Sequence, residues 1–240
     1  MAERIKQDII DLLMVPSTAT LTSVMSQLGV TNVFMHRVVP LHPDMKMAGP
    51  AFTLRYIPVR QDLGASVIDN LRDVQRIGIE EIDQGQILVI DARGDTRAGT
   101  MGSILATRIC QRGAAGVVTD GAFRDSPSIA GIGIPAYAVA MNANSNKTVH
   151  QPSEIQVPIA CGGVAVVPND IIVGDGEGVV VIPASMAKKA AKMAVAMEEK
   201  EEFLIGKIRA GASIFGIYPP DEKTLAEYEE WKAKTSTQSL

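Results

Sequence analysis

The sequence predicts an α/β protein, and three observations lead to that prediction. A short β-branched run, Ile87–Ile90, ends in an aspartate and suits a buried strand. A polar loop and a helix-like segment, Ser103–Arg112, separate it from a second buried run, Gly116–Thr119, which also ends in an aspartate. Four further β-rich pieces follow between residues 155 and 183. In open sheets built this way, ligands bind where the loops leave the carboxyl ends of the strands.

The chain begins with two predicted helices. Residues Ile5–Met14 place their apolar side chains on one side of a helix, and Pro16 ends it. Ser17 and Thr18 are candidate caps for a second helix, in which apolar residues recur at helical spacing until Gly29.

The middle of the chain alternates between strands and helices. Ala51–Pro58 is predicted as a strand and Val67–Ile77 as a helix. Beyond the central stretch, Ser128–Gly131 is predicted as a short helix and Pro135–Ala140 as a strand. The polar segment Met141–Pro152, with three asparagines and a histidine, is predicted as an exposed loop.

The last part of the chain changes from strands to helices. Between Ile155 and Pro183 the pattern is that of hairpin strands joined by glycine- and aspartate-rich turns. Ala184–Arg209 carries one apolar stripe along a long helix, and Asp221–Lys232 is predicted as a last helix. Trp231, the only tryptophan, lies in this tail, so we expect the tail to dock on its own domain or on a neighbouring subunit.

Composition excludes several classes of protein. The chain has 240 residues, 46% hydrophobic and 21% charged, which is ordinary for a globular protein. A net charge of −4 gives no reason to expect a nucleic-acid partner. Two cysteines, Cys110 and Cys161, are too few for a disulfide framework and are predicted to be buried free thiols. Neither a signal peptide nor a membrane-spanning run is found in the sequence, so we expect a cytoplasmic protein without a membrane partner.

The central stretch also predicts a binding site. The free N–H groups of Ser103, Ile104 and Leu105 would open the helix, where the helix dipole favours an anion. Arg124 offers a planar fork that matches a carboxylate, and Asp125 is a hard oxygen ligand suited to Mg²⁺ or Mn²⁺. Together they predict a site for a small carboxylate chelated to a divalent ion. The alternative is that Arg124 and Asp125 form a surface turn with a weak ion pair.

Three segments of the chain resemble one known family. GSILATRICQRGAAGVVTDGAFRD, with GPAFTLRY (Gly49–Tyr56) upstream and PNDIIVGDGEGVVVIP (Pro168–Pro183) downstream, resembles the RraA-like family. That family joins the regulator of ribonuclease activity A with the class II 4-hydroxy-4-methyl-2-oxoglutarate aldolases. The resemblance implies an α/β sandwich with a swivelling β/β/α-type core in residues 1–183. Residues 184–240 would form a C-terminal helical extension.

The resemblance also implies a function and an assembly. The expected function is a divalent-metal-dependent lyase that cleaves a 2-oxo dicarboxylic acid, such as 4-hydroxy-4-methyl-2-oxoglutarate or oxaloacetate, to give pyruvate. Asp125 would be the direct ligand of Mg²⁺ or Mn²⁺, Arg124 would bind the substrate, and the amides of Gly102–Leu105 would hold its carboxylate. The site would lie between subunits of a homotrimer or hexamer. The alternatives are a non-catalytic regulator that binds a ribonuclease, or a family member that acts on a different 2-oxo acid.

One residue departs from the aldolase pattern. The aldolases carry an acidic residue, then twenty residues, then Arg-Asp, and here the acidic position holds Ser103. A hydroxyl cannot act as a carboxylate base, so either the base comes from elsewhere, the substrate differs, or the protein is not an aldolase. Asp91, Asp95 and Asp120 are near in sequence and are candidates for the missing carboxylate.

Overall fold

The computed structural model describes residues 5–62, 69 and 71–238, with side chains through residue 234. Its centre is a mixed, nearly closed sheet in the order β1-β6-β5-β3-β2-β10-β11, with β4 paired to β5 and β7 to β2. A small hairpin, β8–β9, lies beside it. The strands are β1 (Val39–Pro40), β2 (Met47–Pro58), β3 (Ile87–Asp91), β4 (Gly99–Met101), β5 (Gly116–Phe123), β6 (Ala136–Met141), β7 (His150–Ile155), β8 (Ile159–Cys161), β9 (Val164–Val166), β10 (Ile171–Gly174) and β11 (Val179–Ile182).

The middle of the sheet is parallel and buried on both faces. Strands β2, β3, β5 and β6 pair in parallel, while β1, β7 and β10 join them antiparallel. Side chains alternate along β3, so Leu88 and Ile90 pack in one apolar cluster and Ile87 and Val89 in another. A strand buried on both faces needs apolar residues at every position, which explains the continuous run in the sequence.

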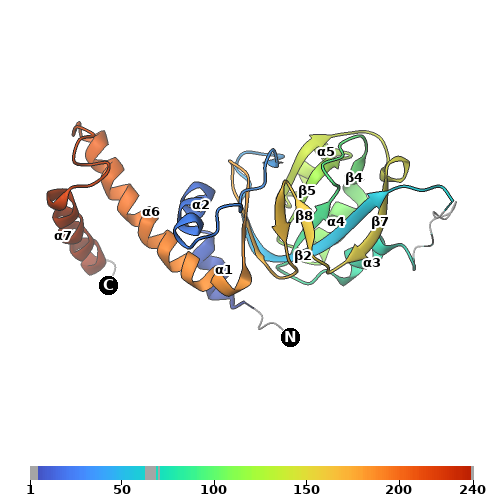
Figure 1. The fold of residues 1–240 in the computed structure, drawn as a ribbon, viewed down its shortest axis with the longest axis horizontal. Helices are drawn as coiled ribbons and strands as arrows, with labels where there is room; N and C mark the ends of the chain where they lie inside the picture. Colours follow the sequence, from blue (N-terminus) through green and yellow to red (C-terminus); the bar gives the residue numbers. More distant parts are fainter. Residues whose placement is uncertain (1–4, 63–68, 70, 239–240) are drawn as a thin grey trace.

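Three short helices cover one face of the parallel strands (Figure 1). They are α3 (Val74–Glu81), α4 (Ser103–Gln111) and α5 (Ser126–Ile132). Ile79, Ile109 and Ile129, one from each helix, are buried with Leu88 and Ile90 of β3. On the other face, the β8–β9 hairpin closes a second cluster around Ile87 and Val89. The layered α/β architecture expected from the sequence is therefore confirmed.

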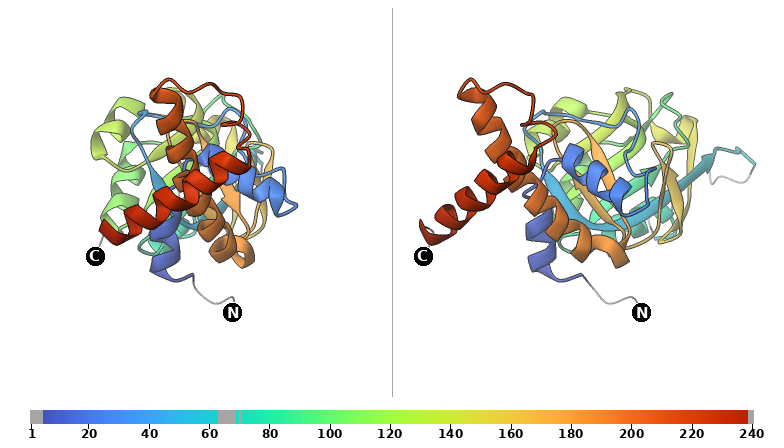
Figure 2. Two further views of the ribbon diagram at one scale, coloured as in Figure 1. Left: turned by 90° about the vertical axis from the view of Figure 1, so that its left-hand side faces the viewer. Right: turned by 60° about the vertical axis from the view of Figure 1, so that its left-hand side comes forward.

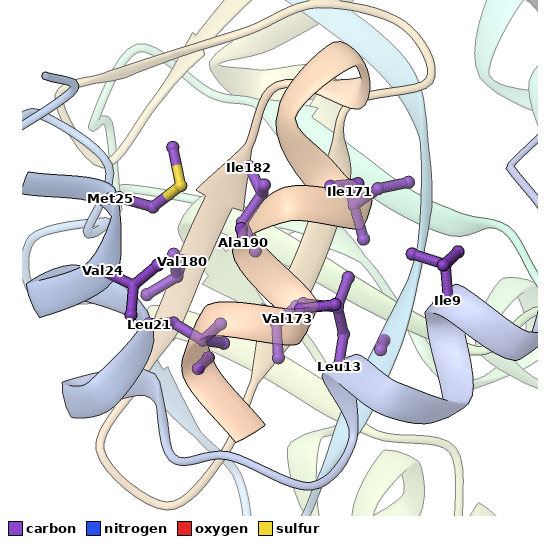
Figure 3. Close-up of a cluster of buried hydrophobic side chains, with 14 of the residues drawn as sticks. Ile9, Leu13, Leu21, Val24, Met25, Ile171, Val173, Val180, Ile182 and Ala190 are labelled. Atoms are coloured by element: carbon purple, nitrogen blue, oxygen red, sulfur yellow. The ribbon is translucent and has the colours of Figure 1, made fainter. Parts of the chain in front are cut away.

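A second group of helices covers the antiparallel end of the sheet (Figure 3). Helices α1 (Gln7–Leu13), α2 (Thr18–Gln27) and the first half of α6 (Ala187–Arg209) pack on β10 and β11 in one buried cluster. Ser17 caps α2, as predicted, by accepting a hydrogen bond from the Thr20 amide. The Asp175 carboxylate accepts another from the Thr18 amide at 2.7 Å, which fixes α2 to the β10–β11 turn.

The rest of α6 and helix α7 (Glu222–Gln238) extend away from the sheet (Figures 1 and 2). Trp231 of α7 packs against Phe203 of α6 with ring centroids 5.5 Å apart, so the tail docks on its own chain. The first half of α6 is buried in one cluster with α1 and α2. That residues 184–240 form a separate extension stays a prediction.

Three predictions about individual elements were wrong. The segment Met141–Pro152 is not wholly an exposed loop, because β7 begins at His150 and that histidine is buried against Tyr56. The predicted helix Val67–Ile77 begins only at Val74, since Leu71 and Arg72 form a turn and Asp73 is the N-cap. Residues 67, 68 and 70 of that prediction lie outside the described part. Strand β5 continues to Phe123, beyond the aspartate that was expected to end the buried run Gly116–Thr119.

The cysteine prediction holds in part, because Cys161 is buried whereas Cys110 is only partly buried, and both are free thiols. In the described segments, no single helix has the length and apolar character to cross a membrane. Helices α1 and α2 reach that length only as a pair bent by 109°.

Candidate functional site

The six residues predicted for the site line a single cavity of about 210 Å³. They come from two places in the chain, the start of α4 and the end of β5. The cavity wall is completed by residues that the sequence did not single out. Those additional lining residues are Asp73, Gln75, Arg76, Gly99, Thr100, Met101, Ser145, Asn146 and Lys147.

A short strand within the predicted loop brings the two places together. Gly99 and Met101 of β4 pair with Ala122 and Phe123 of β5, and the Arg124 amide donates to the Met101 carbonyl at 2.9 Å. Any Cβ on Gly99 would lie 2.7 Å from the Arg124 backbone nitrogen, so only glycine permits this close approach. The pairing sets the start of α4 directly beside Arg124 and Asp125.

The first turn of α4 offers free donors to the cavity. Gly102 is the N-cap and supplies no side-chain cap, and the first helical bond runs from the Ala106 amide to the Gly102 carbonyl. In the described structure the amides of Ser103, Ile104 and Leu105 donate no hydrogen bond. Three unpaired N–H groups at a helix N-terminus form a site for one carboxylate.

Asp125 adopts a left-handed backbone conformation, with φ of 59°, at the N-cap of α5. An aspartate at this position ordinarily caps its own helix, yet the Asp125 side chain makes no cap hydrogen bond. Its carboxylate instead turns toward α4, where it accepts a hydrogen bond from the Ser103 hydroxyl at 3.4 Å. Non-glycine residues in this region of φ are uncommon and concentrate at functional sites.

Arg124 and Asp125 form only a loose ion pair. Arg124 Nε lies 3.6 Å from Asp125 Oδ1, and the two side chains are 50% and 42% exposed. A single contact of this length at the surface contributes little stability. Both groups therefore keep most of their hydrogen-bonding capacity for a ligand.

A buried hydrogen-bond network forms the cavity floor. The Thr100 carbonyl of β4 accepts from the Tyr56 hydroxyl and from Gln75 Nε2, each at 2.9 Å. Asn146 Nδ2 donates to Gln75 Oε1 at 3.0 Å. Burial raises the pKa of Tyr56 far above its ordinary value, so the phenol stays a neutral donor. This network joins β2, α3, β4 and the 3₁₀ turn Asn146–Thr148 into one rigid wall.

Sequence reasoning missed Asp73, Arg76 and Lys147, which bring ionisable side chains to that wall. Aspartate is a preferred N-cap residue, so Asp73 could have been recognised as the start of α3. In the structure its side chain accepts a hydrogen bond from the Arg76 amide at 3.0 Å. No local pattern reveals that α3 and residues 145–147 face α4 across a cavity, since that depends on the tertiary fold.

The three aspartates proposed to replace the acidic position lie elsewhere. Asp91 and Asp120 line a different cavity, of about 410 Å³, with Arg37 and Arg93. Asp120 accepts from the amides of Ala92 at 2.7 Å and Gly94 at 3.0 Å, and burial raises its pKa to about 6.

The third candidate, Asp95, pairs with Arg97, which lowers its pKa to about 2. None of the three belongs to the lining of the predicted site, and the carboxylate that does, besides Asp125, is Asp73.

The donor set fits a divalent cation held mainly by water. Mg²⁺ usually keeps several waters and binds through one or two carboxylates. The described residues contain no cluster of three or more histidine, cysteine or acidic side chains that could hold a metal ion. Asp125 alone would be the direct ligand, with the Ser103 hydroxyl beside it. Gly102 leaves the necessary space, because a Cβ there would lie 3.0 Å from Asp125 Oδ2.

Comparison with known proteins gives the family. The family model "RraA-like: Aldolase/RraA" matches residues 9–181. A protein of Halalkalibacterium halodurans named "Putative 4-hydroxy-4-methyl-2-oxoglutarate aldolase" is 31% identical over 186 residues, which are 76% of this chain and 82% of that protein. "Protein DlpA" of Legionella pneumophila is 28% identical over 177 residues, and the match covers 74% of this chain but only 28% of that protein.

A solved structure agrees with these matches. Streptomyces coelicolor RraAS2, described as "an unusual member of the RNase ES inhibitor RraA protein family", superposes with a TM-score of 0.76 and 30% identity. The match covers 85% of this chain and 98% of that one. From the extent of the family match and the shared fold, the chain belongs to the RraA-like family.

Proposed function

We propose that this protein is a divalent-metal-dependent lyase that cleaves a 2-oxo dicarboxylic acid, such as 4-hydroxy-4-methyl-2-oxoglutarate or oxaloacetate, and releases pyruvate. The observation that supports it most is the Asp125 carboxylate, which leaves its own helix uncapped and faces the free amides of α4. The aldolase named among the relatives is consistent with this reaction.

Each site residue has a role in the proposed reaction. The amides of Ser103, Ile104 and Leu105 bind the substrate carboxylate together with the Arg124 guanidinium. Asp125 would hold Mg²⁺ or Mn²⁺, which when bound supplies a Lewis acid at the 2-oxo group. As the bond between C3 and C4 breaks, negative charge develops on the 2-oxo oxygen, and Arg124 stabilises that charge.

The test is pyruvate release from both substrates, with Mg²⁺ or with EDTA, by the parent and by Asp125→Asn. Asparagine tolerates the left-handed backbone at this position, so the fold is kept while the charge is lost. We expect turnover that EDTA abolishes and that Asp125→Asn lowers by about 10²–10³-fold. Turnover that survives both changes would contradict the metal role.

A second candidate function is a non-catalytic regulator that binds a ribonuclease. Ser103 favours it, because this position lacks the carboxylate of the aldolases, and the Streptomyces relative is described as a member of a ribonuclease-inhibitor family. This alternative predicts that the chain captures an endoribonuclease in a pull-down and turns over no 2-oxo acid. A homotrimer or hexamer and a cytoplasmic location remain predictions, which analytical ultracentrifugation and cell fractionation would test.

A further inference from the structure

Asp73 is the second carboxylate of the candidate site. It lines the same cavity as Ser103, Arg124 and Asp125 and belongs to a different element, as the N-cap of α3. At about 210 Å³ the cavity has the size of one small organic acid, so a ligand held by α4 would also meet the α3 wall. A carboxylate on that wall can compensate for the one that Ser103 lacks.

The structural role of Asp73 uses only one of its oxygens. Oδ1 accepts the hydrogen bond from the Arg76 amide and so caps α3. In the described structure no hydrogen bond or ion pair is made by Oδ2, and the side chain is only partly buried. The other oxygen therefore stays available to accept a proton.

A near neighbour of Asp73 is fixed in the cavity floor. Gln75, two residues later, is 3% exposed and is fixed between the Thr100 carbonyl and Asn146. The charge of Asp73 also contributes to the raised pKa of Tyr56, whose hydroxyl is bonded to the same Thr100 carbonyl. The Asp73 carboxylate therefore interacts electrostatically with the hydrogen-bond network of the cavity floor.

Charged side chains of both signs line the cavity. Three cationic side chains, Arg76, Arg124 and Lys147, line the cavity against two carboxylates, Asp73 and Asp125. Asp125 is the residue proposed to hold the cation. Asp73 is then the one lining carboxylate left to act as a base among the residues that the structure describes.

We infer that Asp73 is the general base of the aldol cleavage and accepts the proton of the substrate's 4-hydroxyl group. This inference rests on the proposed lyase function. In the step, the O–H bond breaks and the proton moves to the Asp73 carboxylate. The C4–O bond becomes a carbonyl, and the electron pair of the C3–C4 bond moves to the 2-oxo group. The proton later passes to C3, which completes pyruvate.

Oxaloacetate, as an alternative substrate, tests whether Asp73 acts as a base. Its decarboxylation breaks a C3–C4 bond and sends the electrons to the same 2-oxo group, but it releases CO₂ and has no hydroxyl proton to remove. A base at Asp73 is therefore needed for aldol cleavage and dispensable for decarboxylation. Asp73→Asn is the matched variant, because asparagine caps a helix as well as aspartate does and cannot accept the proton.

The experiment measures pyruvate release from 4-hydroxy-4-methyl-2-oxoglutarate and from oxaloacetate, together with the dissociation constant of Mn²⁺, for the parent and for Asp73→Asn. We expect kcat for aldol cleavage to fall by about 10²–10⁴-fold. Decarboxylation and the Mn²⁺ dissociation constant should stay within about threefold. Adding Ser103→Asp to Asp73→Asn should restore part of the aldol cleavage.

Other results would overturn the inference. If Asp73→Asn lowered both reactions equally, or neither, Asp73 would not be the base. A parent that decarboxylates oxaloacetate but cleaves no 4-hydroxy-2-oxo acid would also overturn it and leave the lyase function standing. A parent that releases pyruvate from neither substrate would overturn the proposed function and this inference together.

Discussion

Asp120 and Asp125 lie five residues apart near the end of one strand, yet the protein uses them in opposite ways. Asp120 is 6% exposed, and both its oxygens accept backbone amides from the loop after β3. Asp125 is half exposed, and its oxygens meet only a loose guanidinium and one long hydroxyl contact. A carboxylate whose oxygens are all satisfied by the fold stabilises a loop, and one whose oxygens remain unpaired can bind a ligand.

The largest effect we expect is at the candidate site that Arg124 and Asp125 form. Arg124→Ala should lower kcat/KM through the loss of about 2–4 kcal/mol of transition-state stabilisation, because the guanidinium would pair with a carboxylate of the substrate. Arg97→Ala is the control, since the exposed Arg97 pairs with Asp95 outside the cavity, and its kcat/KM should match the parent. Equal kcat/KM for Arg124→Ala and the parent would show that Arg124 has no part in the reaction.

Substitution of Asp120 should lower the stability of the fold. Asp120→Ala leaves the amides of Ala92 and Gly94 without an acceptor, so the free energy of unfolding at pH 5 should fall by about 1–3 kcal/mol. Asp125→Asn removes the charge of the other carboxylate and keeps a residue that tolerates the left-handed backbone, and it should alter this free energy by less than about 0.5 kcal/mol. Urea denaturation of both variants measures the difference, and similar losses would mean that the two carboxylates are equivalent.

Asp120 should also make stability depend on pH. Burial raises its pKa to about 6 from an ordinary 3.8, so the folded state binds the proton more tightly than the unfolded state. The stabilisation is complete below about pH 4 and is lost as the pH rises through 6, with a slope of up to about 1.4 kcal/mol per pH unit. Urea denaturation at pH 4, 5, 6 and 7 should show this slope in the parent and not in Asp120→Asn. An identical pH profile in both would contradict the raised pKa.

The sequence predicted one wall of the site and not the other, for a physical reason. Residues 102–105 and Arg124–Asp125 follow directly from helix start signals and strand ends, which are local patterns. Asp73 and Lys147 reach the cavity only because β2, β4 and α3 meet through the Tyr56–Thr100–Gln75 network, a contact among distant segments. His150 was predicted to lie in an exposed loop for the same reason, because its polar neighbours in the sequence do not indicate that it packs against Tyr56.

The smallest effect concerns the space beside Asp125. A Cβ on Gly102 would lie 3.0 Å from Asp125 Oδ2, and the extended backbone there, with φ of −115°, accepts alanine without strain. Gly102→Ala should therefore fold normally and weaken Mn²⁺ binding by on the order of 1 kcal/mol, or about fivefold. Gly131→Ala in α5 meets no atom within 4 Å and is the control for the glycine-to-alanine change itself. Titration of Mn²⁺ followed by electron paramagnetic resonance measures both. The substitution removes no ligand and no charge. Unchanged Mn²⁺ affinity in Gly102→Ala would therefore mean that the cation does not bind at the Asp125 oxygen that faces α4. That conclusion would hold even if Asp125→Asn abolished turnover.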